Sequence, residues 1–571
     1  MSCKTYGEVR SGSGPPLGLL LLKGAGGMLS LDHVSYAYPG LAYAVEDLSL
    51  CVSQGGWVVV VGPSGSGKST LAALASGSLS PVSGQVTADD RDVRDSCDVA
   101  LVRQDPSSQF VSSLVEDDVA FGPRNLGLDA DAIRTRVREA LELAGILSLS
   151  HKDVNELSGG QRQLVALAGA LALRPRYLVL DEVCSQLDSA AREALRRVVG
   201  VLRRRGVGIL EVTHLVEELI GAEEVIVLSA GRAVWEGTPQ GLFANSGACR
   251  LAGLVGPDAR LCASLAAAGV DLSVALIDLE AACATLRDKD KVAIWDALKG
   301  SLDFKRTGLG GVSPTERMQG GLELDSVFLY LEDASAYGTG AACVLADISL
   351  AAAFGRVLLL AGPSGSGKTT SALVMAGLIE ADSGTSMLDG RPVRPSDVGL
   401  AFQRPEEQLF ANTVLDDVAF GALARGAGAK AARSQAQEAL ERLGIERTLW
   451  DRSPLALSGG EARRVALAGI VAMRPSAYVF DEPTAGLDGR AARRVIALTR
   501  ELATDGAAVV VISHEVGEWL GVAGDGCLLR EGRVVWSGSH AELLASPGTF
   551  RRAGLKVPLA VRVGEALGER R

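Results

Sequence analysis

The sequence lacks the features that mark several classes of protein. Its nine cysteines include no Cys-x-x-Cys pair, so nothing indicates a zinc or iron–sulfur site. No apolar stretch reaches the roughly 20 residues that a membrane helix needs. The run at residues 17–22 is also shorter than the core of a signal peptide. We therefore expect reduced thiols and a cytoplasmic protein that contacts a membrane only through partners.

An excess of positive charge is missing too. The formal net charge is −11 over 571 residues, which gives no reason to expect a nucleic-acid partner. A hydrophobic content of 47% with 22% charged residues is typical of a folded soluble protein, which makes disorder an unlikely starting assumption. The length predicts more than one domain.

What the chain does contain is an internal repeat, which sets the expected architecture. Four features recur 300 positions later: residues 62–69 at 362–369, 157–160 at 457–460, 181–182 at 481–482, and His214 as His514. The carboxyl-terminal ends of the two copies also correspond, so each copy should carry its own tail. We expect a mobile amino-terminal tail over residues 1–27, a first domain over 28–275, a linker over 276–320 and a second domain over 321–571.

Both copies read as α/β. Short continuous apolar runs, such as residues 57–61 and 357–361, suit parallel strands that are buried on both faces. The Ala-, Leu- and Arg-rich segments between these runs are long enough to form crossover helices. The predicted fold class is two tandem P-loop NTPase domains. Each should have a mostly parallel core sheet, a helical subdomain and a small carboxyl tail.

The repeated glycine-rich segment has the P-loop pattern Gly-x-x-x-x-Gly-Lys-Ser/Thr after an apolar run. Its glycines let backbone N–H groups turn inward and surround phosphate oxygens, and the following helix adds its positive end. We predict that Lys68 and Lys368 contact phosphate, and that Ser69 and Thr369 bind Mg²⁺. The phosphate-binding residues are Gly62, Pro63, Ser64, Gly65, Ser66, Gly67, Lys68, Ser69 and Thr70, and Gly362, Pro363, Ser364, Gly365, Ser366, Gly367, Lys368, Thr369 and Thr370.

An Asp-Glu pair ends a later apolar run in each copy. Asp181 and Asp481 are expected to help hold Mg²⁺. Glu182 and Glu482 are placed to orient or deprotonate the attacking water. Alone, such a pair would more often be a solvated turn or a helix cap, but the P-loop upstream reverses that preference.

A Leu-Ser-Gly-Gly sequence precedes a helix-like stretch in each copy. Its serine can cap that helix, and its glycines let phosphate approach the backbone closely. Together with the P-loops, the segments 157–161 and 457–461 resemble the signature motif of the ATP-binding-cassette family. His214 and His514, each at the end of the next apolar run, look like the family's switch histidines and would contact the γ-phosphate.

The resemblance implies that each ATP lies between the P-loop of one copy and the signature of the other, so the two cassettes would pair within one chain. The first site would join Lys68, Ser69, Gln104, Asp181, Glu182 and His214 to Ser458, Gly459 and Gly460. The second would join Lys368, Thr369, Gln403, Asp481, Glu482 and His514 to Ser158, Gly159 and Gly160. Gln104 and Gln403 would also approach the metal.

The segments after these glutamines, residues 104–122 and 403–421, resemble the ATPase subunits of energy-coupling-factor importers, which take up vitamins and transition-metal ions. That resemblance implies two partners, a transmembrane coupling protein and a small membrane protein that captures substrate. It places the chain at the cytoplasmic face of a membrane. The coupling protein would insert helices into grooves formed in part by these segments, whose Phe110, Phe121, Phe410 and Phe420 could equally be ordinary core residues.

Some departures and alternatives remain. Val183-Cys184 stands where the second copy has Pro483-Thr484, so the two sites could differ in rate, and Glu461 replaces the usual signature glutamine, which could weaken the first site. The adenine-stacking aromatic is open between Tyr36 and Tyr38, with Tyr330 as the candidate in the second copy. Other possible functions are the ATPase of another ABC transporter, including an exporter, and a soluble tandem cassette that acts on ribosomes. DNA-repair cassettes are disfavoured, because their zinc cysteines are absent.

Overall fold

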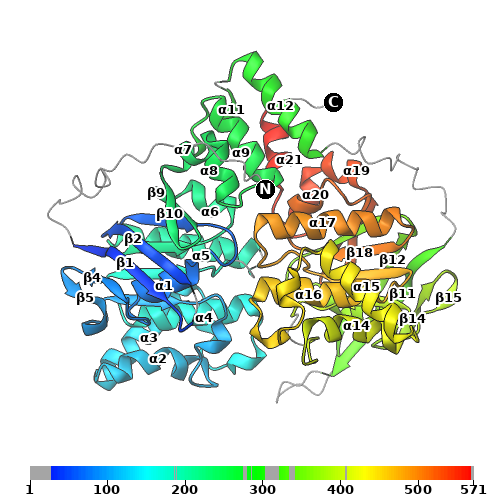
Figure 1. Cartoon of the computed structure of the whole chain (residues 1–571), viewed down its shortest axis with the longest axis horizontal. Coiled ribbons are helices and arrows are strands. Elements are labelled where there is room, and N and C mark those ends of the chain that lie inside the picture. Colours follow the sequence, from blue (N-terminus) through cyan, green and yellow to red (C-terminus); the bar gives the residue numbers. More distant parts are fainter. Residues whose placement is uncertain are drawn as a thin grey trace, which may run out of the picture.

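The computed structural model describes residues 27–40, 42–184, 187, 189–273, 279–284, 286–302, 320–332, 341–404 and 408–567. The predicted amino-terminal tail, apart from residue 27, and the later part of the predicted linker (303–319) lie outside these residues. The described chain forms two similar halves that lie side by side (Figure 1). Within it, none of the helices has the length and apolar character that crossing a bilayer requires.

The predicted core sheet is present in both halves. In the first half, the strand order is β10-β9-β3-β8-β7-β6, and every neighbouring pair is parallel except β10 with β9. The strands are β3 (Trp57–Val61), β6 (Val99–Val102), β7 (Tyr177–Asp181), β8 (Gly208–Val212), β9 (Glu224–Ser229) and β10 (Arg232–Gly237). All five residues of β3 are buried, because both faces of this sheet are covered.

The second half repeats this sheet in the order β16-β17-β18-β13-β19-β20. Its strands are β13 (Val357–Ala361), β16 (Val398–Ala401), β17 (Ala477–Asp481), β18 (Ala508–Ile512), β19 (Asp525–Arg530) and β20 (Arg533–Ser539). The predicted fold class, two tandem α/β P-loop domains with mostly parallel core sheets, is confirmed by this arrangement.

Each half also has an antiparallel four-stranded sheet, which the apolar runs did not predict. The orders are β2-β1-β4-β5 and β12-β11-β14-β15. The strands are β1 (Met28–Ala37), β2 (Tyr43–Ser53), β4 (Ser83–Ala88), β5 (Arg91–Asp92), β11 (Gly321–Glu332), β12 (Ala341–Ala353), β14 (Ser383–Leu388) and β15 (Arg391–Pro392). Alternating side chains of β1 and β2 face the core sheet, so this layer covers one face and holds the P-loop helix between the two sheets.

Apart from the P-loop helices α1 and α13, which lie between the two sheets, helices cover the other face, form the signature subdomains or belong to the carboxyl tails. In the first half they are α1 (Lys68–Ala75), α2 (Val115–Asn125), α3 (Ala130–Ala144), α4 (Gly159–Ala172), α5 (Ser189–Arg204), α6 (Val216–Ile220), α7 (Pro239–Ala244), α8 (Ser246–Leu251) and α9 (Pro257–Ala267). In the second half they are α13 (Lys368–Met375), α14 (Val414–Ala424), α15 (Ala429–Arg442), α16 (Gly459–Ala472), α17 (Gly489–Thr504), α18 (Val516–Trp519), α19 (His540–Leu544), α20 (Pro547–Arg552) and α21 (Leu559–Ala566).

The segment predicted as a linker contains two helices, α11 (Leu279–Ala284) and α12 (Asp288–Leu302). They lie with α9 and α21 above the junction of the halves (Figure 1). Leu559, Ala560 and Val563 of α21 join the same apolar cluster as Leu279 and Ile294, so the carboxyl end of the second half packs into the core of the first. Burial of this shared apolar surface favours contact between the two tails.

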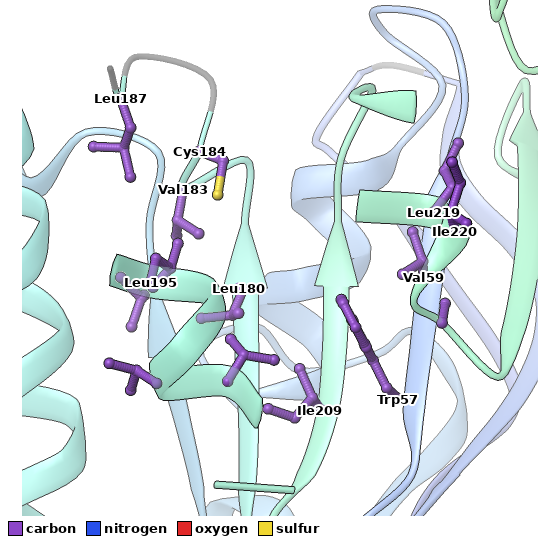
Figure 2. Close-up of a cluster of buried hydrophobic side chains, with 14 of the residues drawn as sticks. Trp57, Val59, Leu180, Val183, Cys184, Leu187, Leu195, Ile209, Leu219 and Ile220 are labelled. Atoms are coloured by element: carbon purple, nitrogen blue, oxygen red, sulfur yellow. The ribbon is translucent and has the colours of Figure 1, made fainter. Parts of the chain in front are cut away.

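Val183 and Cys184, which depart from the Pro-Thr of the second copy, belong to the core of the first half. They are 3% and 2% exposed, and they lie near Leu180, Leu187 and Leu195 (Figure 2). These side chains therefore affect the ATP site of the first half through packing and not through contact with a ligand.

Candidate active sites

Each P-loop connects a central strand to a helix, β3 to α1 and β13 to α13. The glycine before each P-loop lysine has a left-handed backbone, with φ of 101° at Gly67 and 95° at Gly367. A Cβ at Gly67 would lie 2.0 Å from the carbonyl oxygen of Ala44, so both the backbone conformation and the close approach require glycine there. The loop can then aim its N–H groups inward at the helix N-terminus, as phosphate binding needs.

The P-loop lysines lie within their own loops. Nζ of Lys68 donates hydrogen bonds to the carbonyl oxygens of Gly62, at 2.8 Å, and Pro63, at 3.1 Å. Lys368 makes the same two bonds to Gly362 and Pro363, both at 2.7 Å. Lys68 is only 7% exposed, so its charge is held inside the loop where a phosphate would lie.

Two of the three predicted metal ligands in each half are hydrogen-bonded to each other. The hydroxyl of Ser69 donates to Asp181 over 3.1 Å, and that of Thr369 donates to Asp481 over 2.7 Å. Burial raises the pKa of each aspartate to about 6, and the carboxylate of the following glutamate adds to the shift. A buried carboxylate beside a hydroxyl is a hard-oxygen donor set with excess negative charge, and it fits Mg²⁺.

Glu182 and Glu482 share an unusual backbone conformation. Both have φ of 49°, in the left-handed region that non-glycine residues rarely adopt. Such strain persists where the surrounding structure enforces it, which is common in active sites. The carboxylate of Glu482 accepts a hydrogen bond from the backbone N–H of His514, at 3.0 Å.

The two switch histidines contact these glutamates differently. Nδ1 of His514 lies 2.6 Å from Oε1 of Glu482, whereas Nδ1 of His214 lies 3.8 Å from Oε2 of Glu182. Burial would lower the pKa of His514, but the charge and hydrogen bond of Glu482 raise it to about 9. Burial would likewise raise the pKa of Glu482, but His514 and Lys368 hold it below its ordinary value. The second pair is therefore a closed ion pair.

The signature segments begin α4 and α16 with a capping box. Ser458 accepts a hydrogen bond from the backbone N–H of Glu461, and the Glu461 carboxylate accepts one from Ser458 N–H at 2.9 Å. Gln161 completes the same box with Ser158. The unusual Glu461 thus supports its helix start as the glutamine does.

Most of the residues predicted for the second site, drawn from both halves, line one cleft of about 570 Å³. The second half contributes Ser364, Gly365, Gly367, Lys368, Thr369, Thr370, Gln403, Asp481, Glu482 and His514, and the first contributes Gly159 and Gly160. Gln104 and Gly459 also line it. Among the described residues, Ser158, Gly362, Pro363, Ser366, Ser458 and Gly460 do not, and Ser158 instead caps α4.

At the first site, the P-loop of the first half faces the second half. The backbone N–H of Ser64 donates to the carboxylate of Asp488 over 2.9 Å, and a Cβ at Gly460 would lie 3.8 Å from the Ser64 hydroxyl. The structure therefore brings the signature of the second half to the first P-loop. Because each signature faces the other half's P-loop, the pairing of the cassettes is built within one chain.

Two further residues, Asp488 and Arg463, belong to the site but had no assigned role in the sequence, and Tyr38, one of the two candidates for the adenine-stacking aromatic, lies near the first P-loop. Asp488 reaches across to the opposite P-loop, and Arg463 donates to the carbonyl oxygens of Glu482, at 2.8 Å, and Gln403, at 2.7 Å. The hydroxyl of Tyr38 lies 3.3 Å from that of Thr70, which places Tyr38 beside the first P-loop helix. A signal existed for Asp488, because the Leu-Asp sequence at 487–488 also stands at 187–188. Nothing in the sequence singled out Arg463.

The family described as ABC transporter matches residues 45–185 and 345–485. A putative ABC transporter ATP-binding protein of Streptomyces avermitilis is 32% identical over 92% of this chain and 96% of its own length. One of Bifidobacterium longum is 34% identical over 85% of this chain, which spans 63% of that relative. A putative HMP/thiamine import ATP-binding protein, YkoD of Bacillus subtilis, is 29% identical over 93% of this chain and 95% of its own length.

Among solved structures, cbiO1 of Clostridium perfringens, described as part of the cbiONQ ABC transporter complex, is 31% identical. The match extends over 40% of this chain and 94% of the cbiO1 chain, with a TM-score of 0.36.

Proposed function

Because the chain belongs to the ABC transporter family of ATPases, we propose that it is the energy-coupling subunit of a membrane importer for a vitamin or a transition-metal ion. It carries two ATP-binding cassettes in one chain. ATP binding would draw the two halves together, and hydrolysis would release them. This closure and opening is the two-state element that can drive a membrane partner.

The proposed chemistry uses residues that already lie together. The P-loop backbone and Lys368 would hold the β- and γ-phosphates of ATP, and Gly159 and Gly160 of the other half would close over them. Mg²⁺, when bound by Thr369 and Asp481, neutralises charge on the phosphate oxygens. Glu482 would orient and deprotonate the attacking water. It must first leave His514, whose imidazole then turns toward the γ-phosphate.

The observation that carries the importer proposal is an exposed aromatic pair after Gln403. Phe410 is 66% exposed and Phe420 is 51% exposed, and their rings meet edge to face at 4.8 Å. Exposed aromatic groups of this size are typical of interaction surfaces. Asp417 fixes the segment, because its carboxylate accepts hydrogen bonds from the backbone N–H groups of Phe410, at 2.8 Å, and Ala411, at 2.7 Å.

The first half presents a similar surface after Gln104. Val111 is 61% exposed and Phe121 is 43% exposed, while Phe110 packs partly against the core. Asp118 accepts hydrogen bonds from the N–H groups of Val111, at 2.7 Å, and Ser112, at 3.1 Å, as Asp417 does in the other half. Each half could therefore receive one apolar helix of a transmembrane coupling protein at the cytoplasmic face of the membrane.

The substrate class rests on resemblance. Residues 104–122 and 403–421 resemble energy-coupling-factor ATPases, and YkoD, which is 29% identical, bears a name that describes HMP/thiamine import. In this proposal a second, small membrane protein captures the substrate. The ATPase chain then needs no substrate pocket of its own.

The test is affinity purification of the tagged chain from detergent-solubilised native membranes, followed by mass spectrometry. Recovery of a polytopic membrane protein with one or more small membrane proteins would support the proposal. A Phe410→Ser, Phe420→Ser variant should lose these partners, while Val535→Ser, which alters an equally apolar and 45% exposed residue on β20, should keep them. Recovery of ribosomes, or equal recovery by both variants, would overturn the importer assignment.

A further inference from the structure

The two halves differ at the surface where they meet. Arg192, near the start of α5, and Glu515, directly after the switch His514, form an ion pair between halves. The positions 300 residues away carry Ala492 and Leu215, so the reciprocal pair cannot form. This contact therefore acts on one ATP site only.

Arg192 is held firmly at this boundary. It is 8% exposed, and its Nη1 lies 2.5 Å from Oε1 of Glu515. Its Nη2 donates a hydrogen bond to the carbonyl oxygen of Leu187, at 3.0 Å, in the loop that precedes α5. The guanidinium thus joins that loop of the first half to the switch segment of the second. The Arg192 side chain is 10% exposed and that of Glu515 is 37% exposed, so the contact is enclosed mainly on its arginine side.

Glu515 lies close to the free side of the switch histidine. Nδ1 of His514 is engaged by Glu482, whereas its Nε2 is buried and has no hydrogen-bond partner among the described residues. Oε1 of Glu515 lies 3.7 Å from that Nε2, just beyond hydrogen-bond distance. Burial would raise the pKa of Glu515, but Arg192 and His514 lower it to about 2, so the carboxylate is charged.

We propose that Arg192 is a positioning residue supplied in trans to the second ATP site, where it holds Glu515 away from Nε2 of His514. This inference rests on the proposed function, since it assigns the released Nε2–H to the γ-phosphate. Without Arg192, the carboxylate would move onto Nε2 and form a charge-assisted hydrogen bond. The imidazole would then be fixed between Glu482 and Glu515 and unavailable to the nucleotide.

The consequence is a site that depends on contact with the other half. When the halves separate, Arg192 leaves and Glu515 blocks the switch. When they meet, Arg192 withdraws Glu515 and the second site becomes competent. At the first site Leu215 holds the position of Glu515, so no carboxylate directly follows His214.

The test resolves the two sites in the purified full chain. With a photoreactive azido-ATP as the substrate, orthovanadate traps azido-ADP where hydrolysis has occurred, and irradiation then labels that half, which mass spectrometry assigns by peptide. Arg192→Ala should reduce trapping in the second half by about tenfold, a change of roughly 1.4 kcal/mol, and leave the first half unchanged. Apparent ATP affinity should stay within about twofold, because the P-loop contacts remain.

Suppression is the decisive measurement. Glu515→Leu copies Leu215, removes the blocking carboxylate and should restore trapping in the Arg192→Ala background. Arg192→Lys should retain most of the nucleotide trapping in the second half. Arg203→Ala serves as the matched control, since Arg203 lies on the same helix and also pairs with a glutamate, Glu223. It should trap ADP as the wild type does.

The remaining outcomes separate the two proposals. Equal loss in both halves, no loss in Arg192→Ala, or failure of Glu515→Leu to suppress would overturn the role of Arg192 while leaving the ATPase intact. Absence of trapping in either half of the wild-type chain would overturn the assigned chemistry of the sites and this inference with it. The result does not depend on any membrane partner.

Discussion

Nδ1 of His514 lies 2.6 Å from Oε1 of Glu482, while the corresponding atoms of His214 and Glu182 are 3.8 Å apart. In the second half the glutamate is bound to the histidine. In the first, Glu182 also faces Lys68 at 3.6 Å. The contact between glutamate and histidine is therefore tighter in the second half than in the first. Different rates follow if release of the glutamate contributes to the barrier.

Glu482→Gln should slow hydrolysis in the second half by about 100-fold or more, since general-base catalysis typically contributes at least that factor, and the phosphate release that remains should come from the first half. Binding of a fluorescent ATP analogue should persist, because the P-loop is unchanged. Glu182→Gln should slow release too, and the double variant should be the slowest. Near-normal turnover in both Glu182→Gln and the double variant would contradict the assignment of these residues.

Thr369→Val removes the hydroxyl that bonds Asp481 at 2.7 Å and keeps the side-chain shape. The Mg²⁺ concentration that gives half-maximal ATPase activity should rise by about tenfold or more, equivalent to roughly 1.4 kcal/mol. Titration of ATPase activity with free Mg²⁺ measures this. Thr385→Val, at an exposed position on β14, should leave the curve unshifted, and an identical curve for both variants would exclude Thr369 as a ligand.

Glu211→Gln should flatten the fall of stability with rising pH. Burial and the charge of Glu218 raise the pKa of the Glu211 carboxyl well above 4.5, so the folded chain keeps a proton that the unfolded chain releases. The resulting stability is present at low pH and is lost as pH rises through the folded-state pKa. Glutamine removes this titration and still offers an oxygen to Trp57 Nε1–H, which donates to Glu211 over 2.9 Å.

The melting temperature, followed from pH 5 to 9, measures this effect. At the alkaline end the Glu211→Gln variant should melt higher than wild type, by about 2–4 °C for each kcal/mol regained. Glu193→Gln, at an exposed position on α5, should follow the wild-type slope. Parallel slopes for all three proteins would show that Glu211 does not titrate in this range.

Asp417→Ala should weaken partner binding without touching the ATP sites. It removes the carboxylate that fixes the N–H groups of Phe410 and Ala411, so the exposed aromatic segment loses its defined shape. Recovery of membrane partners should fall by about tenfold, as a loss of roughly 1.4 kcal/mol would give. Asp416→Ala, a neighbouring and exposed change, is the control, and equal recovery by both would argue against a docking role for this loop.

Much of the fold and of each half-site was predictable, because backbone conformation and strand burial restrict which residues can stand at nearby positions. A glycine with φ near 100° must stand before Lys68 and before Lys368, and buried parallel strands appear as continuous apolar runs. The antiparallel layer was missed, because the long strands β1 and β2 mix buried and partly exposed residues around register shifts. Helix α12 was missed because its charged positions resembled a linker.

The sequence by itself determined the repeat, the P-loops, the acidic strand ends and the signature caps. Each of these depends on residues a few positions apart, whose chemistry fixes the backbone between them. The tertiary structure alone decided what meets across the halves: Ser64 with Asp488, 424 positions away, and Arg192 with Glu515. Such contacts depend on how two whole domains pack. The sequence around a single arginine in a helix does not indicate which carboxylate it will contact.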